Sequence, residues 1–229
     1  MESLLNSKKD EFAKRLLEWH AKNKRDFSWR RTKDPFHILI AEIMLRKTDA
    51  KKVCKIYDEF IRRYPTPKAL AKADAKKLKK QIHLLGIHRR AELLKSLAQD
   101  LMKEHSGIVP RNKAKLLDLP GVGEYIANAV LCFAFDYDAP LLDANIIRIL
   151  NRVFALKSPK ARQRTDKMMW DAAEKLIPSG QAKEFNWAIL DFAALICTVQ
   201  KPKCSACPIE KLCIHTQNAN ILLKMLLFY

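Results

Sequence analysis

Hydrophobic residues recur along this chain at the three- and four-residue spacing of an α-helix, and no alternating strand pattern persists. The spacing predicts a first helix around residues 12–19 and a second that begins at Pro35, since proline favours the first helical turn. Further helices are predicted over residues 53–64, 67–73, 75–84 and 89–105. Only five glycines occur in 229 residues. The sequence therefore predicts an all-α fold.

The segment LLDLPGVGEYIANAVLCFAF interrupts this pattern. One helix ends near Leu119, and Pro120 precedes Gly121 and Gly123. The next helix then carries an apolar stripe of Ile126, Ala129, Val130 and Phe133. Such a segment predicts a helix-hairpin-helix over residues 112–135, in which glycine allows positive φ and close approach of another backbone. Amide N–H groups at the start of a helix can hold a phosphate, but a plain connection between helices has the same pattern.

Asp143 precedes the following predicted helix, in APLLDANIIRILNRVF. Buried positions of that helix are predicted at Ile146, Ile149, Leu150 and Val153. Aspartate is a favoured N-cap, worth about 1 kcal/mol, so this position alone favours a capping role. A catalytic role requires that Asp143 also face a cleft that receives DNA from the hairpin.

Net charge and hydropathy indicate the kind of partner and the compartment of this protein. The chain holds 43 Lys and Arg against 25 Asp and Glu, a net charge of +18, which favours a polyanionic partner although a lysine-rich soluble surface gives the same total. No apolar run approaches the roughly 20 residues of a membrane span, and the N-terminus lacks the apolar core of a signal peptide. We expect a cytoplasmic, nucleoid-associated protein without a membrane partner, whose apolar tail ILLKMLLFY packs or pairs.

Four of the six cysteines follow the spacing C-x6-C-x2-C-x5-C, at Cys197, Cys204, Cys207 and Cys213. Thiols stay reduced inside the cell, so the cluster predicts a metal site rather than disulfides. Four thiolates suit either tetrahedral zinc or a [4Fe–4S] cluster, and the spacing alone does not name the metal. The other cysteines, Cys54 and Cys132, lie in apolar helical stretches and are predicted to be in the core.

In combination, the LPGVG hairpin, the position of Asp143 and the cysteine spacing resemble the helix-hairpin-helix DNA glycosylases of the endonuclease III superfamily. The resemblance runs from about Leu16 to Cys213. It implies two α-helical lobes with a DNA-binding cleft: residues 28–138 with the hairpin, and residues 1–27 plus 139–229 with a [4Fe–4S] cluster on 197–213. It also implies a monomer whose partner is double-stranded DNA with a mismatched or damaged base.

The resemblance gives three residues catalytic roles. Asp143 matches the catalytic carboxylate, and Glu42 matches a glutamate of the base pocket. Tyr125 stands where the bifunctional members carry the lysine that forms a Schiff base. Because a phenol cannot form an imine, we expect a monofunctional enzyme that removes a base and leaves an abasic site.

The substrate is the finer question. The segment from LLEWHAKN to IMLRKT looks like the start shared by adenine glycosylases and archaeal-type thymine-DNA mismatch glycosylases. Four departures disfavour adenine: Arg46-Lys47 in place of a glutamine pair, Ala144 after Asp143, Ile87-His88 in place of an aromatic pair, and the end of the chain soon after the cysteines. We expect thymine or uracil opposite guanine as the target. Adenine opposite guanine or 8-oxoguanine remains the alternative, and a non-catalytic DNA-binding Fe–S protein or a zinc module is a distant one.

The resemblance also predicts DNA contacts in four parts of the chain. The residues expected there are Arg46, Lys47, Ile87 and His88 at the mispair, Leu119, Gly121 and Gly123 in the hairpin, Asn145 and Arg148 after the catalytic carboxylate, and Lys201 and Lys203 in the cysteine loop.

Overall fold

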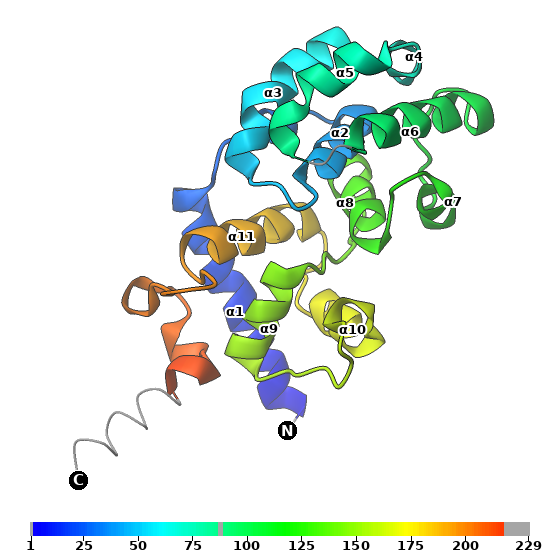
Figure 1. The fold of residues 1–229 in the computed structure, drawn as a ribbon. Coiled ribbons are helices and arrows are strands. Elements are labelled where there is room, and N and C mark those ends of the chain that lie inside the picture. Colours follow the sequence, from blue (N-terminus) through cyan, green and yellow to red (C-terminus); the bar gives the residue numbers. More distant parts are fainter. Residues whose placement is uncertain (1, 87–88, 218–229) are drawn as a thin grey trace. The chain divides into compact units, whose positions relative to one another are not determined.

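A computed structural model describes residues 2–86 and 89–217, with side chains from residue 8 onward. Every regular element in these ranges is a helix (Figure 1), so the all-α prediction is confirmed. The chain forms two compact units. One comprises Asp26–Tyr137, and the other joins the preceding segment to the chain that follows. No helix in the described ranges is long and apolar enough to cross a membrane.

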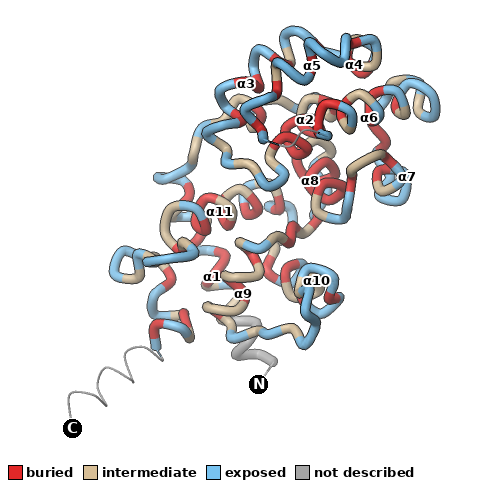
Figure 2. Tube along the Cα trace, viewed as in Figure 1, coloured by how far each residue is buried: buried red, intermediate tan, exposed pale blue. Residues whose placement is uncertain are grey.

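The unit Asp26–Tyr137 is built around two apolar helices that pack on each other, α2 and α8. Eight of the eleven residues of α2 are buried, and Figure 2 shows the helix mostly in the colour of buried residues. Around this pair lie the amphipathic helices, of which α6 packs against α4 and α5. The bounds of the elements are η1 Ser28–Arg30, α2 Pro35–Leu45, α3 Ala50–Arg63, α4 Pro67–Ala71, α5 Ala75–Gln81, η2 His83–Leu85, α6 Arg90–Glu104, α7 Lys113–Asp118 and α8 Glu124–Phe135.

The second unit places α11 against both α1 and α9. Phe12 of α1 lies edge-on to Phe154 of α9 and Phe185 of α11, with ring centroids 5.3 and 6.3 Å away. One aromatic cluster therefore joins three helices. The bounds are α1 Glu2–Asn23, α9 Ala144–Phe154, η3 Gln163–Thr165, α10 Lys167–Lys175, α11 Ala182–Leu195, η4 Cys204–Ala206 and η5 Glu210–Leu212.

Polar side chains at the N-cap position determine where many of these helices begin. Such caps are Asp34, Asp49, Thr66, Asp74, Asn112, Asp143 and Asp166. The Asp49 cap starts α3 three residues before the predicted position. The helix predicted over 75–84 instead ends at Gln81 and continues as a 3₁₀ turn.

The prediction that both remaining cysteines lie in the core is wrong for Cys54. Cys132 is buried, but Cys54 is exposed. Its neighbour Val53 takes the buried face of the amphipathic helix α3. One residue turns the helix by about 100°, which points Cys54 away from that face.

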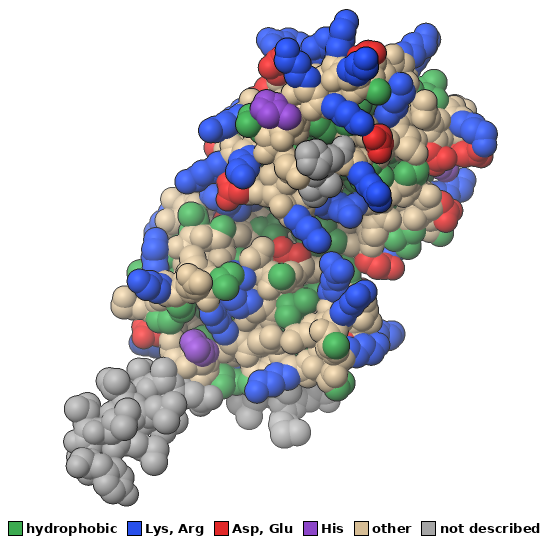
Figure 3. All heavy atoms as spheres, in the orientation of Figure 1, with side chains coloured by type: hydrophobic (Ala, Val, Ile, Leu, Met, Phe, Trp, Pro, Cys, Tyr) green, Lys and Arg blue, Asp and Glu red, His purple; other side chains and the backbone are tan. Residues whose placement is uncertain are grey.

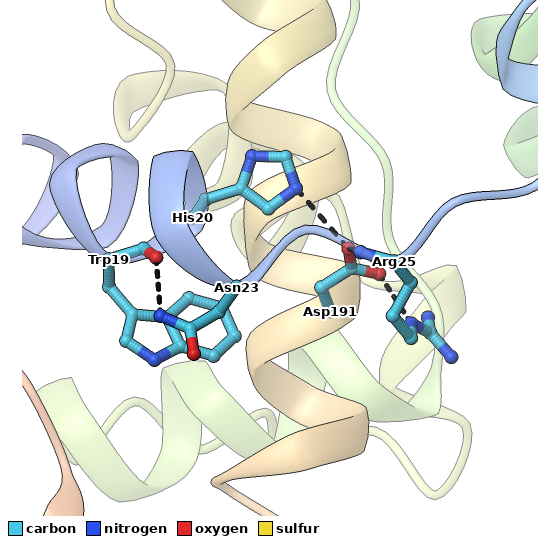
Figure 4. A network of polar contacts seen from close by, with 5 residues as sticks. All are labelled: Trp19, His20, Asn23, Arg25 and Asp191. Atoms are coloured by element: carbon cyan, nitrogen blue, oxygen red, sulfur yellow. Dashed lines mark hydrogen bonds and ion pairs between the residues drawn. The ribbon is translucent and has the colours of Figure 1, made fainter.

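Asp191 of α11 is fully buried and accepts hydrogen bonds at the end of α1 (Figure 4). Its Oδ1 accepts from Nε of Arg25 at 2.6 Å, and its Oδ2 accepts from the Arg25 amide at 2.9 Å. Nε2 of His20 donates to the same Oδ2 at 3.2 Å. Five residues earlier on α11, Asn186 donates to the Ala139 carbonyl at 2.9 Å. Helix α11 thus holds both segments at which the chain leaves and re-enters this unit.

Candidate active site

Asp143 is the N-cap of α9, and it is half-buried. Its Oδ1 accepts from the amides of Asn145 and Ile146, each at 2.9 Å. Its Oδ2 accepts from Nδ2 of Asn145 at 2.8 Å. The capping role predicted for Asp143 is confirmed, and the contact at Oδ2 fixes the orientation of the whole carboxylate.

A chain of hydrogen bonds continues from Asn145 through Arg148. Oδ1 of Asn145 accepts from Nη1 of Arg148 at 3.0 Å. Arg148 donates from Nε to the Cys197 carbonyl at 2.9 Å and from Nη2 to the Ala193 carbonyl at 3.0 Å. Each side-chain nitrogen of Arg148 therefore donates inside this unit. These contacts link Asp143 to the end of α11, and the DNA contacts expected of Asn145 and Arg148 stay a prediction.

Arg152, one turn further along α9, holds the start of the cysteine loop. Its guanidinium donates to the carbonyls of Thr198 and Val199 at 2.6 and 2.9 Å. Nη1 also lies 3.5 Å from Sγ of Cys197, and Sγ of Cys213 lies 3.5 Å from the Arg152 carbonyl. Arg152 is not among the site residues predicted from the sequence, although its spacing from Arg148 puts both on one face of α9.

None of the four clustered cysteines, Cys197, Cys204, Cys207 and Cys213, forms a disulfide. They lie close enough that their charges shift the pKa of Cys204 and Cys207. Burial, together with the nearby charges of the other three thiols, raises the pKa of Cys207 to about 12. Within the described ranges, no group of three or more His, Cys, Asp or Glu is arranged to hold a metal ion. The chemistry of the donor set is nevertheless that of a thiolate-bound cluster, since none of the four thiols forms a disulfide and the cation of Arg152 lies beside Cys197.

The loop between the first two cysteines presents its lysines to solvent. Lys201 and Lys203 are both exposed, and Lys201 has a positive φ of 47°. Thr198 shapes the turn by donating from Oγ1 to the Gln200 and Lys201 carbonyls at 2.6 and 3.2 Å. The loop closes where the Lys203 amide donates to the Ile196 carbonyl at 3.0 Å. Over the wider surface, Lys and Arg side chains are scattered across the visible face and outnumber the Asp and Glu side chains there (Figure 3).

Glu42 and Tyr125 belong to the unit Asp26–Tyr137, on the two helices that pack together. Glu42 is 6% exposed in the middle of α2. Tyr125 is half-buried in the first turn of α8. A carboxyl group retained in so apolar a helix needs compensation for its burial. Asp143, Asn145, Arg148 and the four cysteines lie in the other unit.

The hairpin turn lies between α7 and α8. Gly121 has a φ of +78°, and a Cβ there would lie 2.7 Å from the Leu93 side chain, so this position requires glycine. Gly123 has extended backbone, with a φ of −113°, and is exposed at the start of α8, which has no side-chain cap. Positive φ therefore explains the first glycine of the turn and not the second. Leu119 is 2% exposed, and its amide and carbonyl are both used within the turn.

Arg46 and Lys47 follow α2 in an exposed loop. Nη1 of Arg46 donates to the Gly121 carbonyl at 3.0 Å, which links this loop to the hairpin turn. Ile87 and His88, also predicted at the mispair, lie outside the described residues, as does the apolar tail ILLKMLLFY.

Comparison with known proteins gives consistent matches. The profile of the HhH-GPD superfamily base excision DNA repair protein family matches residues 40–175. A thymine-DNA glycosylase of Aeropyrum pernix is 47% identical over 90% of this chain and 94% of its own. A thymine/uracil-DNA glycosylase of Pyrobaculum aerophilum is 43% identical over 90% of this chain and 92% of its own. The solved structure of a thermostable thymine-DNA glycosylase superposes with a TM-score of 0.88 at 40% identity, covering 93% of this chain and 99% of that one.

An adenine DNA glycosylase of Mycobacterium tuberculosis is also similar, but less so. It is 34% identical over 85% of this chain and 64% of its own. The thymine and uracil glycosylases thus match at higher identity and along nearly their whole length.

Proposed function

The chain belongs to the HhH-GPD superfamily of base excision DNA repair proteins, and from this premise we propose that it is a monofunctional glycosylase. Its substrates are thymine and uracil mispaired with guanine in double-stranded DNA, and its product is an abasic site. The observation that carries the proposal is the carboxylate of Asp143, half-exposed and held at both oxygens. The choice of base follows the thymine and thymine/uracil glycosylases that are 47% and 43% identical to this chain.

The target base lies inside a duplex, so the enzyme must first turn it out of the stack. This costs a few kcal/mol, and less for a mispair than for a Watson–Crick pair. The exposed amides at the uncapped start of α8, beside Gly121 and Gly123, bind a phosphate next to the lesion. Lys201 and Lys203 add phosphate contacts from their exposed loop. These contacts position the strand without reading its sequence.

Cleavage of the N-glycosidic bond develops positive charge on the sugar and negative charge on the leaving base. Asp143 stabilises the cationic sugar or activates the attacking water, and its fixed orientation means that little reorganisation is needed. Glu42 and Tyr125 line the base pocket, with Glu42 bonding to the base. The phenol of Tyr125 forms no Schiff base, so the strand is not nicked. Arg46 and Lys47 contact the guanine left unpaired.

The thiolates of Cys197, Cys204, Cys207 and Cys213 hold a [4Fe–4S] cluster in this proposal. The cluster supplies a redox-capable centre that also crosslinks the loop. Arg152 lies beside the thiols and offsets the negative charge that four thiolates carry. A protein that acts on chromosomal DNA works inside the cell, at the nucleoid, and we propose that it does so as a monomer.

Base release under single-turnover conditions tests the proposal. Duplexes containing G·T, G·U, A·G or A·8-oxoguanine are incubated with excess enzyme and then treated with or without alkali. We expect cleavage at thymine and uracil, seen only after alkali because an abasic site is the product. Release of adenine instead would assign the chain to the adenine enzymes. Strand cleavage without alkali would contradict the monofunctional assignment.

A further inference from the structure

Arg90, the first residue of α6, is a buried cation to which the reaction above gives no role. It is 2% exposed. Its Nη1 donates to the Met44 carbonyl at 2.8 Å and to Oγ1 of Thr48 at 2.9 Å, while Nη2 donates to the Arg46 carbonyl at 2.6 Å. A buried guanidinium is costly unless such acceptors surround it. All three acceptors belong to the short stretch 44–48.

That stretch ends α2 and has an unusual backbone. The last carbonyls of a helix lack partners within the helix, and Arg90 supplies donors to them. Between two of the residues that it contacts, Lys47 has a φ of +52°, a left-handed conformation that costs free energy for any residue other than glycine. Strained backbone of this kind persists only where the surroundings hold it. Hydrogen bonds from Arg90 to the residues on both sides of Lys47 provide that restraint.

The restrained stretch also contacts two neighbouring segments of the same unit. Nη1 of Arg46 donates to the Gly121 carbonyl at 3.0 Å. Oγ1 of Thr48 lies 3.4 Å from the Leu85 carbonyl, at the end of η2. Burial, followed by the nearby charge of Arg46, lowers the pKa of Arg90. Two like charges therefore lie close together, each turned toward backbone carbonyls.

We propose that Arg90 is a positioning residue for recognition of the mispair. It holds residues 44–48 in the strained shape that keeps Arg46 on the hairpin turn and presents Arg46 and Lys47 to DNA. Arg90 itself, being buried, touches no DNA. The inference rests on the proposed function, because that function places Arg46 and Lys47 opposite the unpaired guanine.

The test compares Arg90→Met and Arg90→Lys with the wild-type holoprotein. Affinity is measured for G·T and G·C duplexes of one sequence, over a range of salt concentrations. A fluorine at the 2′ carbon of the target sugar slows cleavage. We expect Arg90→Met to lower the G·T to G·C affinity ratio by about tenfold, the discrimination that one base contact provides. The affinity ratio of Arg90→Lys should lie between those of wild type and Arg90→Met, since an ammonium keeps the charge but lacks the planar fork of donors.

The salt dependence separates positioning from direct contact. A residue that binds a phosphate releases a counterion, and its loss lowers the salt slope by about one. We expect both Arg90 variants to keep the wild-type slope. A slope lower by about one would show that Arg90 binds phosphate and would overturn the proposal.

Leu101→Ala is the matched control for general loosening of the unit. Leu101 is fully buried on the same helix, about 16 Å further along its axis. We expect this variant to lose thermal stability and keep the affinity ratio. If it lowers the ratio as much as Arg90→Met at an equal distance below the melting temperature, Arg90 has no specific role.

Amide hydrogen exchange tests the positioning role of Arg90 independently of the proposed function. A wild-type protein that showed no preference for G·T over G·C would refute the function. Even then, Arg90→Met should accelerate exchange of the Thr48 amide, which donates to the Leu45 carbonyl at 3.1 Å. Leu101→Ala should not. Unchanged exchange at Thr48 in Arg90→Met would overturn the positioning role by itself.

Discussion

Nδ2 of Asn145 lies 2.8 Å from Oδ2 of Asp143, and this hydrogen bond fixes the carboxylate oxygen that the helix cap leaves available. The orientation of the Asn145 amide is itself determined, because its Oδ1 accepts from Arg148. Arg148 in turn donates to the carbonyls of Ala193 and Cys197. The geometry of Asp143 is therefore tied to the end of α11 and to the first residue of the cysteine loop.

Replacing Asn145 tests whether this contact supports turnover. We expect Asn145→Ala to lower the single-turnover rate of base release by about 10- to 100-fold, because a small misplacement of a reacting group has effects of that size. Affinity for mispaired DNA should change little. Asn151→Ala is the control, since Asn151 lies on the same helix and donates to Gln163 rather than Asp143. Equal losses in the two variants would refute the positioning role.

Two substitutions of Asp143 separate its cap from its charge. Asparagine caps helices about as well as aspartate, so Asp143→Asn should change the free energy of unfolding by less than about 0.5 kcal/mol, whereas Asp143→Ala should cost about 1 kcal/mol. Both should lower the rate of base release by about 100-fold or more, because each removes the negative charge. Chemical unfolding and single-turnover assays measure the two effects. Normal base release by Asp143→Asn would remove Asp143 from the mechanism.

Tyr125→Lys places an amine where the proposed mechanism has a phenol. A lysine in a partly buried pocket is able to attack the sugar and form an imine. We expect this variant to nick the strand without alkali and to be trapped covalently on DNA by borohydride, while wild type is not. Absence of any trapped species would argue against the position assigned to Tyr125.

Local features of the fold were predictable from sequence. The apolar stripe of Ile146, Ile149, Leu150 and Val153 is buried as its helical spacing indicates. Gly121 has the positive φ that a tight turn demands. In each case the signal lies within a few residues of sequence, as the spacing along one helix or the residues of one turn.

Long-range contacts were not predictable in the same way. Arg148 meets the Cys197 carbonyl across 49 positions of sequence, and Arg90 meets Met44 across 46. In the sequence Arg90 stands within HRRAE, which has the composition of a solvated helix start. Only the packing of α6 against the end of α2 shows it to be buried. Helical periodicity does not show which backbone carbonyls accept hydrogen bonds from a distant side chain.

The cysteine loop predicts a defined iron content. We expect about four iron and four sulfide ions per chain in protein purified without oxygen. Cys207→Ala removes one ligand and should lower that content sharply, whereas Cys54→Ala, at an exposed site on α3, should not. Elemental analysis and visible absorption measure both. One zinc per chain, with no iron, would refute the cluster and favour a zinc site.

The buried carboxylate of Asp191 should contribute strongly to stability. Its Oδ1 and Oδ2 accept from His20 and from the amide and guanidinium of Arg25, with no exposed surface. Removing one partner of a buried charged network leaves the others without compensation, which costs about 3–5 kcal/mol. We expect Asp191→Ala to lower the free energy of unfolding by that amount.

Asp26→Ala is the matched control, because Asp26 pairs with Arg31 at the surface, where both side chains are mostly exposed. Exposed ion pairs contribute about 0–1 kcal/mol, so this variant should unfold almost as wild type does. Urea unfolding of the two proteins at one pH makes the comparison. If Asp191→Ala lost no more stability than Asp26→Ala, the anchoring of Arg25 by α11 would be energetically unimportant, and the segment leaving α1 would need another source of order.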